Sequence, residues 1–165
     1  MENKPSLHFF CGKMAAGKTT LAKKLAQKYG AIYIGEDDWL TMLYPTEISK
    51  LTDYLNYSGR LKSLLGAHVQ TLLSHGVSVV MDFPGNTIKQ RNWFKGIYEN
   101  TDYHHLLHYI EASDQLCKRQ LAKRSQTKPD DAAFTSEKEF DEITKYFQAP
   151  SDAEGFNVKK YQPDQ

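Results

Sequence analysis

Eight residues near the start of the sequence have the types and spacing of a phosphate-binding loop. They read Gly-Lys-Met-Ala-Ala-Gly-Lys-Thr from Gly12 to Thr19, after an apolar run and ahead of a helix-forming stretch. Glycines let the backbone wrap a phosphate, helix N-terminal N–H groups attract anions, and a lysine adds a full positive charge. A threonine hydroxyl at the last position suits Mg²⁺. The motif predicts binding of ATP, or another NTP, with Mg²⁺.

The loop also predicts which residues hold the nucleotide. We expect Lys18 to bridge the β- and γ-phosphates and Thr19 to ligate the metal. The predicted nucleotide-binding residues are Gly12, Met14, Ala15, Ala16, Gly17, Lys18, Thr19 and Thr20. The competing interpretation is an ordinary glycine turn between a strand and a helix.

A carboxylate follows the strongest predicted strand. Residues 77–81 form a continuous apolar, β-branched run that ends on Asp82. Ligands gather at the carboxyl ends of parallel strands, so Asp82 is expected near the loop and is predicted to hold Mg²⁺ with Thr19. The alternative is an aspartate that only starts the turn before Phe83-Pro84-Gly85-Asn86.

Two adjacent acids, Asp37 and Asp38, follow another predicted strand. Phosphate transfer to a hydroxyl benefits from a carboxylate that accepts the proton of the acceptor. Aspartate is equally a favoured helix N-cap. We therefore predict that Asp37 is catalytic and that Asp38 caps the following helix.

A predicted helix carries the basic run Lys118-Arg119 and Lys123-Arg124. Arg119 and Lys123 are four residues apart and share a face, while Arg124 meets the same site only if the chain bends there as a lid. Arginine suits phosphoryl oxygens, so Arg119 and Arg124 are predicted to stabilise the charge that develops during transfer. The alternative is a solvated basic helix. We expect a lid at about 115–135, with its far hinge at Lys128-Pro129-Asp130-Asp131.

The remaining pattern alternates strands with helices, which is typical of a parallel sheet covered on both faces. Strands are predicted at 7–11, 31–34, 77–81 and 104–110, with a further edge strand at 156–158. Helices are predicted from the loop to 29, from near 38, over 48–75 in two pieces broken at 57–59, and over 87–100, 113–125 and 136–147. The fold class expected is a three-layer α/β domain spanning 1–165, with about five parallel strands.

Composition excludes several partner classes. Lys and Arg total 21 against 20 Asp and Glu, a net charge of +1, which gives no basic footprint for broad nucleic-acid or membrane binding. The sequence has no apolar run long enough for a membrane span or a leader, so a cytoplasmic location is expected. Cys11 and Cys117 are expected to be reduced core thiols.

Other side chains are left with open roles. Arg60 and Arg91 are each considered for contact with the acceptor. Trp39, Tyr44, Tyr54 and Tyr57 are considered as walls of its pocket. The six histidines lack metal or catalytic spacing and are interpreted as packing or surface groups.

Together these motifs resemble a family of small P-loop kinases. It includes the 5′-hydroxyl kinase module of polynucleotide kinases, zeta-toxin-like kinases, chloramphenicol phosphotransferase and AAA or ATP-binding proteins. The resemblance rests on the loop at 12–19, on residues 33–39, on Asp82 with Asn86 and Arg91 behind it, and on the basic helix. It implies that Asp37 is the general base and Arg119 the lid arginine.

One position departs from the polynucleotide kinases. In that group an arginine that helps hold the acceptor phosphate follows the acid pair by two positions, where this chain has Leu40. We therefore expect an ATP- and Mg²⁺-dependent kinase for a hydroxyl on a small molecule rather than on nucleic acid. The alternatives are a nucleotide-binding protein or slow ATPase, a polynucleotide 5′-hydroxyl kinase, and a nucleoside-monophosphate kinase.

Overall fold

Five parallel strands form one sheet in the computed structural model, which describes residues 4–128 and 134–164. Their order across the sheet is β2-β3-β1-β4-β5. The strands are β1 (Ser6–Cys11), β2 (Ile32–Gly35), β3 (Val79–Pro84), β4 (His104–Ile110) and β5 (Val158–Tyr161). The helices are α1 (Lys18–Tyr29), α2 (Glu36–Leu43), α3 (Leu51–Ser74), α4 (Ile88–Tyr98), α5 (Asp114–Ser125) and α6 (Glu137–Thr144), with a 3-10 turn η1 (Asp152–Glu154). The predicted three-layer α/β fold is confirmed.

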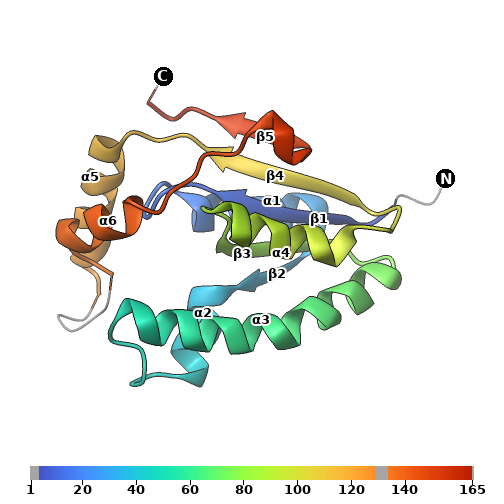
Figure 1. Ribbon diagram of the computed structural model, residues 1–165, viewed down its shortest axis with the longest axis horizontal. Coiled ribbons are helices and arrows are strands. Elements are labelled where there is room, and N and C mark those ends of the chain that lie inside the picture. The colour runs from blue at the N-terminus through green and yellow to red at the C-terminus, as the bar shows by residue number, and fades with distance from the viewer. Residues whose placement is uncertain (1–3, 129–133, 165) are drawn as a thin grey trace.

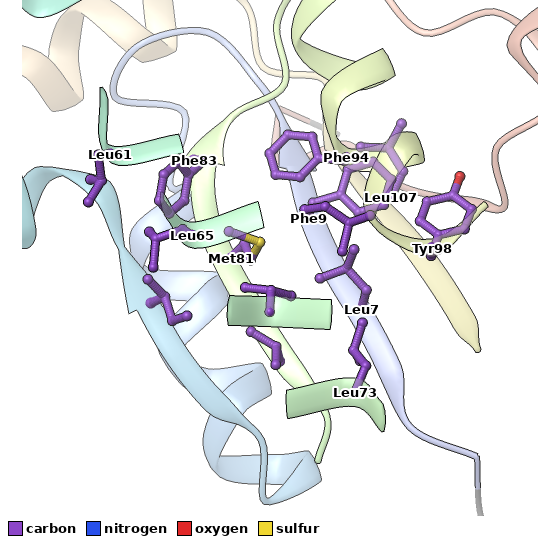
Figure 2. Close-up of a cluster of buried hydrophobic side chains, with 14 of the residues drawn as sticks. Leu7, Phe9, Leu61, Leu65, Leu73, Met81, Phe83, Phe94, Tyr98 and Leu107 are labelled. Atoms are coloured by element: carbon purple, nitrogen blue, oxygen red, sulfur yellow. The ribbon is translucent and has the colours of Figure 1, made fainter. Parts of the chain in front are cut away.

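Alternation along the strands sorts the core into two layers. Leu7 and Phe9 of β1 pack with the apolar faces of α3 and α4, in the cluster drawn in Figure 2. Phe10 and Val80 point to the other face and pack against α1. Successive strand residues face opposite sides of a sheet, so Asp82, two residues beyond Val80, lies on the α1 face. The strand pattern thus aims this acid at the start of α1.

The carboxyl ends of the strands form one edge of the molecule (Figure 1). The loop between β1 and α1 lies at this edge, and α5 and α6 lie beside it, packed on Ala16 through Cys117, Leu121 and Phe140. β1 is central, with β3 and β4 on its two sides. Residues that follow these strands are therefore brought beside the loop.

The predicted break in the long helix is wrong, because α3 is continuous from Leu51 to Ser74. Interior glycine costs a helix only about 1 kcal/mol, and tertiary contacts on both sides of Gly59 offset it. Ser58 is buried against Glu36, and the Tyr57 ring lies 4.1 Å from that of Tyr44. Packing that the sequence pattern does not reveal keeps the helix whole.

Two other predicted boundaries also shift. Strand β3 continues through Asp82 to Pro84, because parallel pairing with β2 and β1 extends to this end. The predicted edge strand forms as β5, starting at Val158, while Phe156 packs edge-on against Phe9 at 5.7 Å. Helix α6 ends at Thr144. Ser113 and Ser136 cap α5 and α6, because their hydroxyls accept from the backbone N–H groups of Leu116 and Glu139.

Both cysteines are buried free thiols, as predicted, and burial raises the pKa of Cys11 to about 12. In the parts of the chain that the structure covers, none of the helices has the length and apolar character needed to cross a membrane.

A buried histidine pair joins β1 to β4. His8 Nδ1 lies 2.9 Å from His108 Nε2, and His108 Nδ1 lies 2.9 Å from the Tyr161 hydroxyl. The two imidazoles are 5% and 1% exposed. Burial lowers the pKa of both rings, that of His108 to about 3, with further lowering from His8 and Lys159. The pair is therefore neutral in the folded protein at pH 7.

This pair predicts acid sensitivity of the fold. Between pH 6.5 and about 3 the unfolded chain binds protons that the folded rings exclude, so stability falls as the pH drops below about 6.5. The lowered pKa of His108 alone should reduce the free energy of unfolding by about 2 kcal/mol when the pH is lowered from 7.5 to 5. Chemical denaturation at both pH values measures this loss, which should shrink in His108→Phe and persist in His68→Asn at the exposed control position. An equal loss in wild type and His108→Phe contradicts the assignment.

Candidate active site

The loop from Gly12 to Thr19 has the backbone of an anion cradle. Ala15 and Gly17 adopt left-handed conformations, with φ of 62° and 107°. Gly17 is the N-cap of α1 and offers no side chain, whereas α4, α5 and α6 are capped by Thr87, Ser113 and Ser136. The first N–H groups of a helix have no carbonyl partner within it. The start of α1 is thus left to bind an external anion.

Lys18 lies folded over this loop. Its ammonium donates to the carbonyl of Gly12 and, at 2.9 Å, to that of Lys13. Burial lowers its pKa, while Asp82 and Asp37 act in the opposite direction. Lys18 therefore lies within electrostatic range of both predicted functional acids, as expected of a charge that bridges phosphates.

Asp82 and Thr19 are brought into direct contact. Thr19 Oγ1 donates to Asp82 Oδ2 at 2.6 Å, and the Tyr33 hydroxyl donates to the same oxygen at 2.9 Å. Burial and the charge of Asp82 raise the pKa of Tyr33, which keeps its hydroxyl a donor. A hydroxyl and a carboxylate beside a phosphate loop are the hard oxygen ligands that Mg²⁺ prefers. The pair fits the predicted metal role.

Asn86 fixes the loop from the β3 side. Its Oδ1 accepts from the N–H of Gly12 at 2.9 Å. Gly85 precedes it, and a Cβ there would stand 2.4 Å from the Phe10 carbonyl. Only glycine allows this close approach, so the turn after Asp82 packs directly on β1.

The predicted capping role of Asp38 is wrong. Helix α2 begins at Glu36 and its N-cap is Gly35, which has an extended backbone. The chain turns into helix straight from β2, so Asp37 and Asp38 both lie in the first helical turn and both are exposed. Asp37 keeps its exposed position at the start of α2, and Asp38 serves no cap.

A third acid, Glu36, was not singled out by the sequence. Its carboxylate is 2% exposed and accepts from the Tyr54 and Ser58 hydroxyls of α3. Burial raises its pKa. Three consecutive acids after a strand predict that one of them faces the site. The run itself does not show which of the three side chains is buried in the protein.

The basic helix α5 lies at the edge that carries the loop (Figure 1). Arg119 is exposed, within electrostatic range of Asp164, and Arg124 is half-buried. The Arg124 Nε is buried without a hydrogen-bond partner among the described residues. Lys118 pairs with Asp141 of α6 at 2.9 Å. Of the predicted hinge, Pro129, Asp130 and Asp131 lie outside the described residues.

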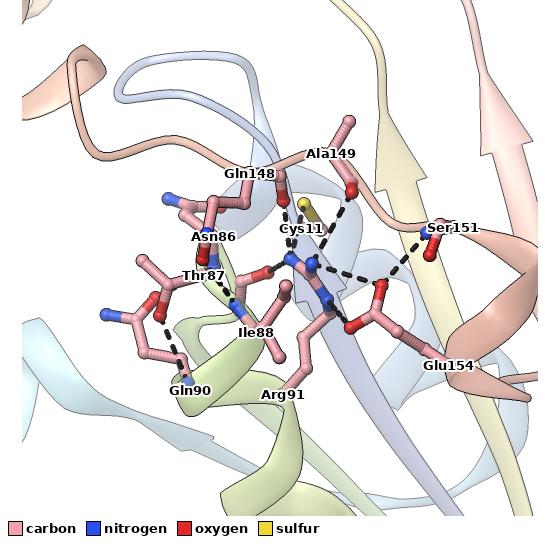
Figure 3. A network of polar contacts seen from close by, with 11 residues as sticks. Cys11, Asn86, Thr87, Ile88, Gln90, Arg91, Gln148, Ala149, Ser151 and Glu154 are labelled. Carbon is pink, nitrogen blue, oxygen red and sulfur yellow. Dashed lines mark hydrogen bonds and ion pairs between the residues drawn. The ribbon is translucent and has the colours of Figure 1, made fainter.

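Arg91 is not an acceptor-binding residue, which corrects one alternative. Its side chain is fully buried and forms an ion pair with Glu154 at 2.8 Å. The Nη1 nitrogen of its guanidinium also donates to the carbonyls of Gly85 and Gln148 (Figure 3). All of these partners hold the guanidinium inside the protein, where it joins α4 to the C-terminal segment. Arg60 is exposed and lies over the Tyr57 ring at 5.5 Å.

The predicted aromatic walls separate into two groups. Tyr44 and Tyr57 pack against each other between α2 and α3, and Tyr54 binds Glu36. Trp39, on α2, remains 37% exposed. Of these four aromatic residues, only Trp39 is exposed.

A pocket of about 350 Å³ opens beside the loop. It lies between Lys13 and the residues that follow β4 and β5, with Tyr109 and Phe147 among its lining. Lys13 crosses it, pairing with Asp114 at 2.6 Å and lying 5.5 Å from the centre of the Phe147 ring. No pattern in the sequence indicates this pocket, because its walls come from segments about 50 and 100 residues apart.

The sequence also matches a known domain family. A family profile described as AAA domain covers residues 7–150, which is most of the chain. The chain belongs to this family of AAA domains. No curated protein matches it.

Solved structures share the fold over nearly the whole chain. A candidate kinase from Chloroflexus aurantiacus J-10-fl aligns with a TM-score of 0.73 and 17% identity, over 99% of this chain and 92% of its own. The APS kinase CysC of Mycobacterium tuberculosis, in complex with AMPPNP and APS, gives a TM-score of 0.64 at 16% identity, over 98% and 90%. Chaetomium thermophilum Kti12, in complex with ADP-AlF3, gives 0.69 at 13%, over 96% and 89%. This AAA domain therefore shares its fold with kinases.

Proposed function

We propose that this AAA domain is an ATP- and Mg²⁺-dependent phosphotransferase that moves the γ-phosphate to a hydroxyl of a small molecule. One observation carries the proposal: at the end of the phosphate loop, the hydroxyl of Thr19, the residue after Lys18, donates to the Asp82 carboxylate at 2.6 Å. A second carboxylate, that of Asp37, is exposed at the start of α2, directly after the neighbouring strand β2. Both carboxylates act against the lowering of the Lys18 pKa. A phosphate held at Lys18 would lie between a metal-binding side and a proton-accepting side.

The residues of the loop would hold the nucleotide for in-line transfer. Backbone N–H groups at the start of α1 bind the phosphates, and Lys18 leaves the carbonyls of Gly12 and Lys13 to bridge the β- and γ-phosphates. Thr19 and Asp82 would hold Mg²⁺, which would supply positive charge to the phosphate oxygens.

Asp37 would receive the proton of the acceptor. As the acceptor oxygen bonds to the γ-phosphorus, the bond from that phosphorus to the β-phosphate oxygen breaks, and the hydroxyl proton passes to the Asp37 carboxylate. Arg119 and Arg124 of α5 neutralise charge on the transferred group once the helix closes over it. Catalysis then depends on positioning and electrostatics.

The nucleoside base would occupy the pocket beside Lys13. Tyr109 and Phe147 are the aromatic residues of its lining, and aromatic side chains stack on bases. This placement puts the base next to the loop and away from Asp37, where the acceptor needs room.

Two features favour a small molecule over nucleic acid. The net charge of +1 gives no long basic track for a phosphate backbone. Leu40 replaces the arginine of the polynucleotide kinases and is only 4% exposed, so that position cannot contact an acceptor phosphate. A neutral or weakly charged alcohol suits the site better.

An acceptor panel tests the proposal. Wild type is incubated with γ-labelled ATP, Mg²⁺ and nucleosides, oligonucleotides, sugars and aminoglycoside- or phenicol-like compounds, and label transfer is measured. We expect stoichiometric transfer to a small-molecule alcohol, with none in Lys18→Ala. Nucleotide at about 100 times its Kd should stabilise wild type by about 2.7 kcal/mol, and this shift should be lost in Lys18→Ala. Hydrolysis that no acceptor changes would instead indicate an ATPase, and transfer to oligonucleotides alone a polynucleotide kinase.

A further inference from the structure

Glu36 is a buried carboxylate with a specific pair of donors. Tyr54 donates to its Oε1 and Ser58 to its Oε2, the latter at 2.7 Å. Both donors lie on α3, one helical turn apart, while Glu36 is the first residue of α2. The two hydrogen bonds therefore fix the first turn of α2 against α3.

This arrangement costs free energy that an apolar contact would not. A carboxylate taken out of water loses its hydration, and an oppositely charged partner is what usually offsets that loss. Among the described residues no ion pair involves Glu36, and two neutral hydroxyls are its hydrogen-bond partners. The two hydrogen bonds instead fix the position of the Glu36 side chain and, with it, the backbone at the start of α2. The next residue along that backbone is Asp37.

Tyr54 also contacts the segment that leads into α6. The Phe134 ring meets it edge-on, with the centroids 5.9 Å apart and an interplanar angle of 72°. Phe134 has a φ of 60°, a left-handed conformation that is strained for a non-glycine residue and persists only where its surroundings impose it. Through this contact, the segment that leads into α6 touches the tyrosine that holds Glu36, the residue before Asp37.

Phe134 is hydrogen-bonded to α6, which packs on the basic helix α5. Its N–H donates to Glu139 of α6 at 2.7 Å. Ser125, the last residue of α5, donates to the Thr135 carbonyl at 3.0 Å, and Lys118 pairs with Asp141. Helices α5 and α6 and Phe134 therefore form one packed unit, which carries Arg119 and Arg124.

We propose that Glu36 is a positioning residue for phosphate transfer, which links the seating of the α5–α6 unit, through Phe134 and Tyr54, to the orientation of Asp37. The inference rests on the proposed function of Asp37. It assigns Glu36 no contact with either substrate. When Phe134 packs on Tyr54, the tyrosine hydroxyl holds Glu36 and the first turn of α2 is fixed; when it withdraws, that turn is released.

Kinetics of conservative variants test the positioning role. Glu36→Gln and Tyr54→Phe should each lower kcat about 10- to 100-fold, with the KM for ATP changed less than threefold. The matched control Tyr103→Phe removes a phenol hydroxyl just before β4, at the amino ends of the strands, and should leave kcat unchanged. Phe134→Leu should also lower kcat, but by much less when Glu36→Gln is already present, because coupled residues are not additive. Fully additive effects, or a higher KM with unchanged kcat, would overturn the inference.

A second measurement does not need an acceptor. Trp39 lies three residues after Glu36 on α2, and Trp93→Phe leaves it as the only tryptophan. In that background, AMPPNP with Mg²⁺ should change the Trp39 emission, and Phe134→Leu and Tyr54→Phe should abolish most of the change while nucleotide still raises Tm. A silent Trp39 at saturating nucleotide, or a full change in both variants, would refute the coupling. Absence of any phosphorylated acceptor would refute only the proposed function.

Discussion

Replacing Asp37 by Asn should lower the rate of phosphate transfer by about 10²–10⁴-fold, the contribution expected of a general base. The amide keeps the size of the side chain but cannot accept the proton of the acceptor. Nucleotide binding should change only a few-fold, because Lys18, Thr19 and Asp82 are untouched. Label transfer measures the first effect, and the nucleotide-induced shift in Tm measures the second.

Asp38→Asn is the matched control for this prediction. Asp38 is the next residue, is exposed like Asp37, and lies in the same helical turn. It caps no helix, so its loss should change neither transfer nor stability appreciably. Equal losses of transfer in the two variants, or equal losses of transfer and nucleotide binding in Asp37→Asn, would remove Asp37 from the catalytic role.

Replacing Arg91 by Met should destabilise the fold by about 3–5 kcal/mol, the usual cost of removing one partner from a buried ion pair. Glu154, whose side chain is 11% exposed, would be left uncompensated, and the Gly85 and Gln148 carbonyls would lose their donor (Figure 3). For a chain of this length the Tm should fall by roughly 6–20 °C. Chemical and thermal unfolding measure the loss.

Lys145→Met provides the comparison on the surface. Its ammonium pairs with Glu142 at 2.9 Å, a distance like that in the Arg91 pair, but both side chains are more than 60% exposed. Exposed pairs contribute about 0–1 kcal/mol, so this variant should be nearly as stable as wild type. If Arg91→Met were no more destabilising than Lys145→Met, the buried network would not hold the C-terminal segment.

Local chemistry explains why much of this protein could be predicted. The phosphate loop is a run of eight residues whose function depends on glycine backbone freedom and on the helix that follows. The caps at Ser113 and Ser136 likewise depend on residues three positions away. The alternation of strands and helices then predicted a parallel sheet, and sheet geometry placed Asp82 beside Thr19.

The failures share a different physical cause. The long helix α3 is continuous because residues of α2 pack on it. The sequence pattern around Gly59 does not indicate these contacts. Asp38 is not a cap because β2 passes into α2 at Gly35, a junction set by how both elements pack. Sequence propensities describe a residue in its own segment, and tertiary contacts override them at such junctions.

The roles of Glu36 and Arg91 were decided by tertiary structure alone. Glu36 belongs to a run of three acids, and only the position of α3, 18 and 22 residues further on, turns its side chain inward. Arg91 meets Glu154 across 63 residues of chain. By itself the sequence determined the phosphate loop, its lysine and the order of the elements, because these depend on neighbours along the chain. Which acids and arginines face the site depends on how distant elements pack, and only the folded structure determines that.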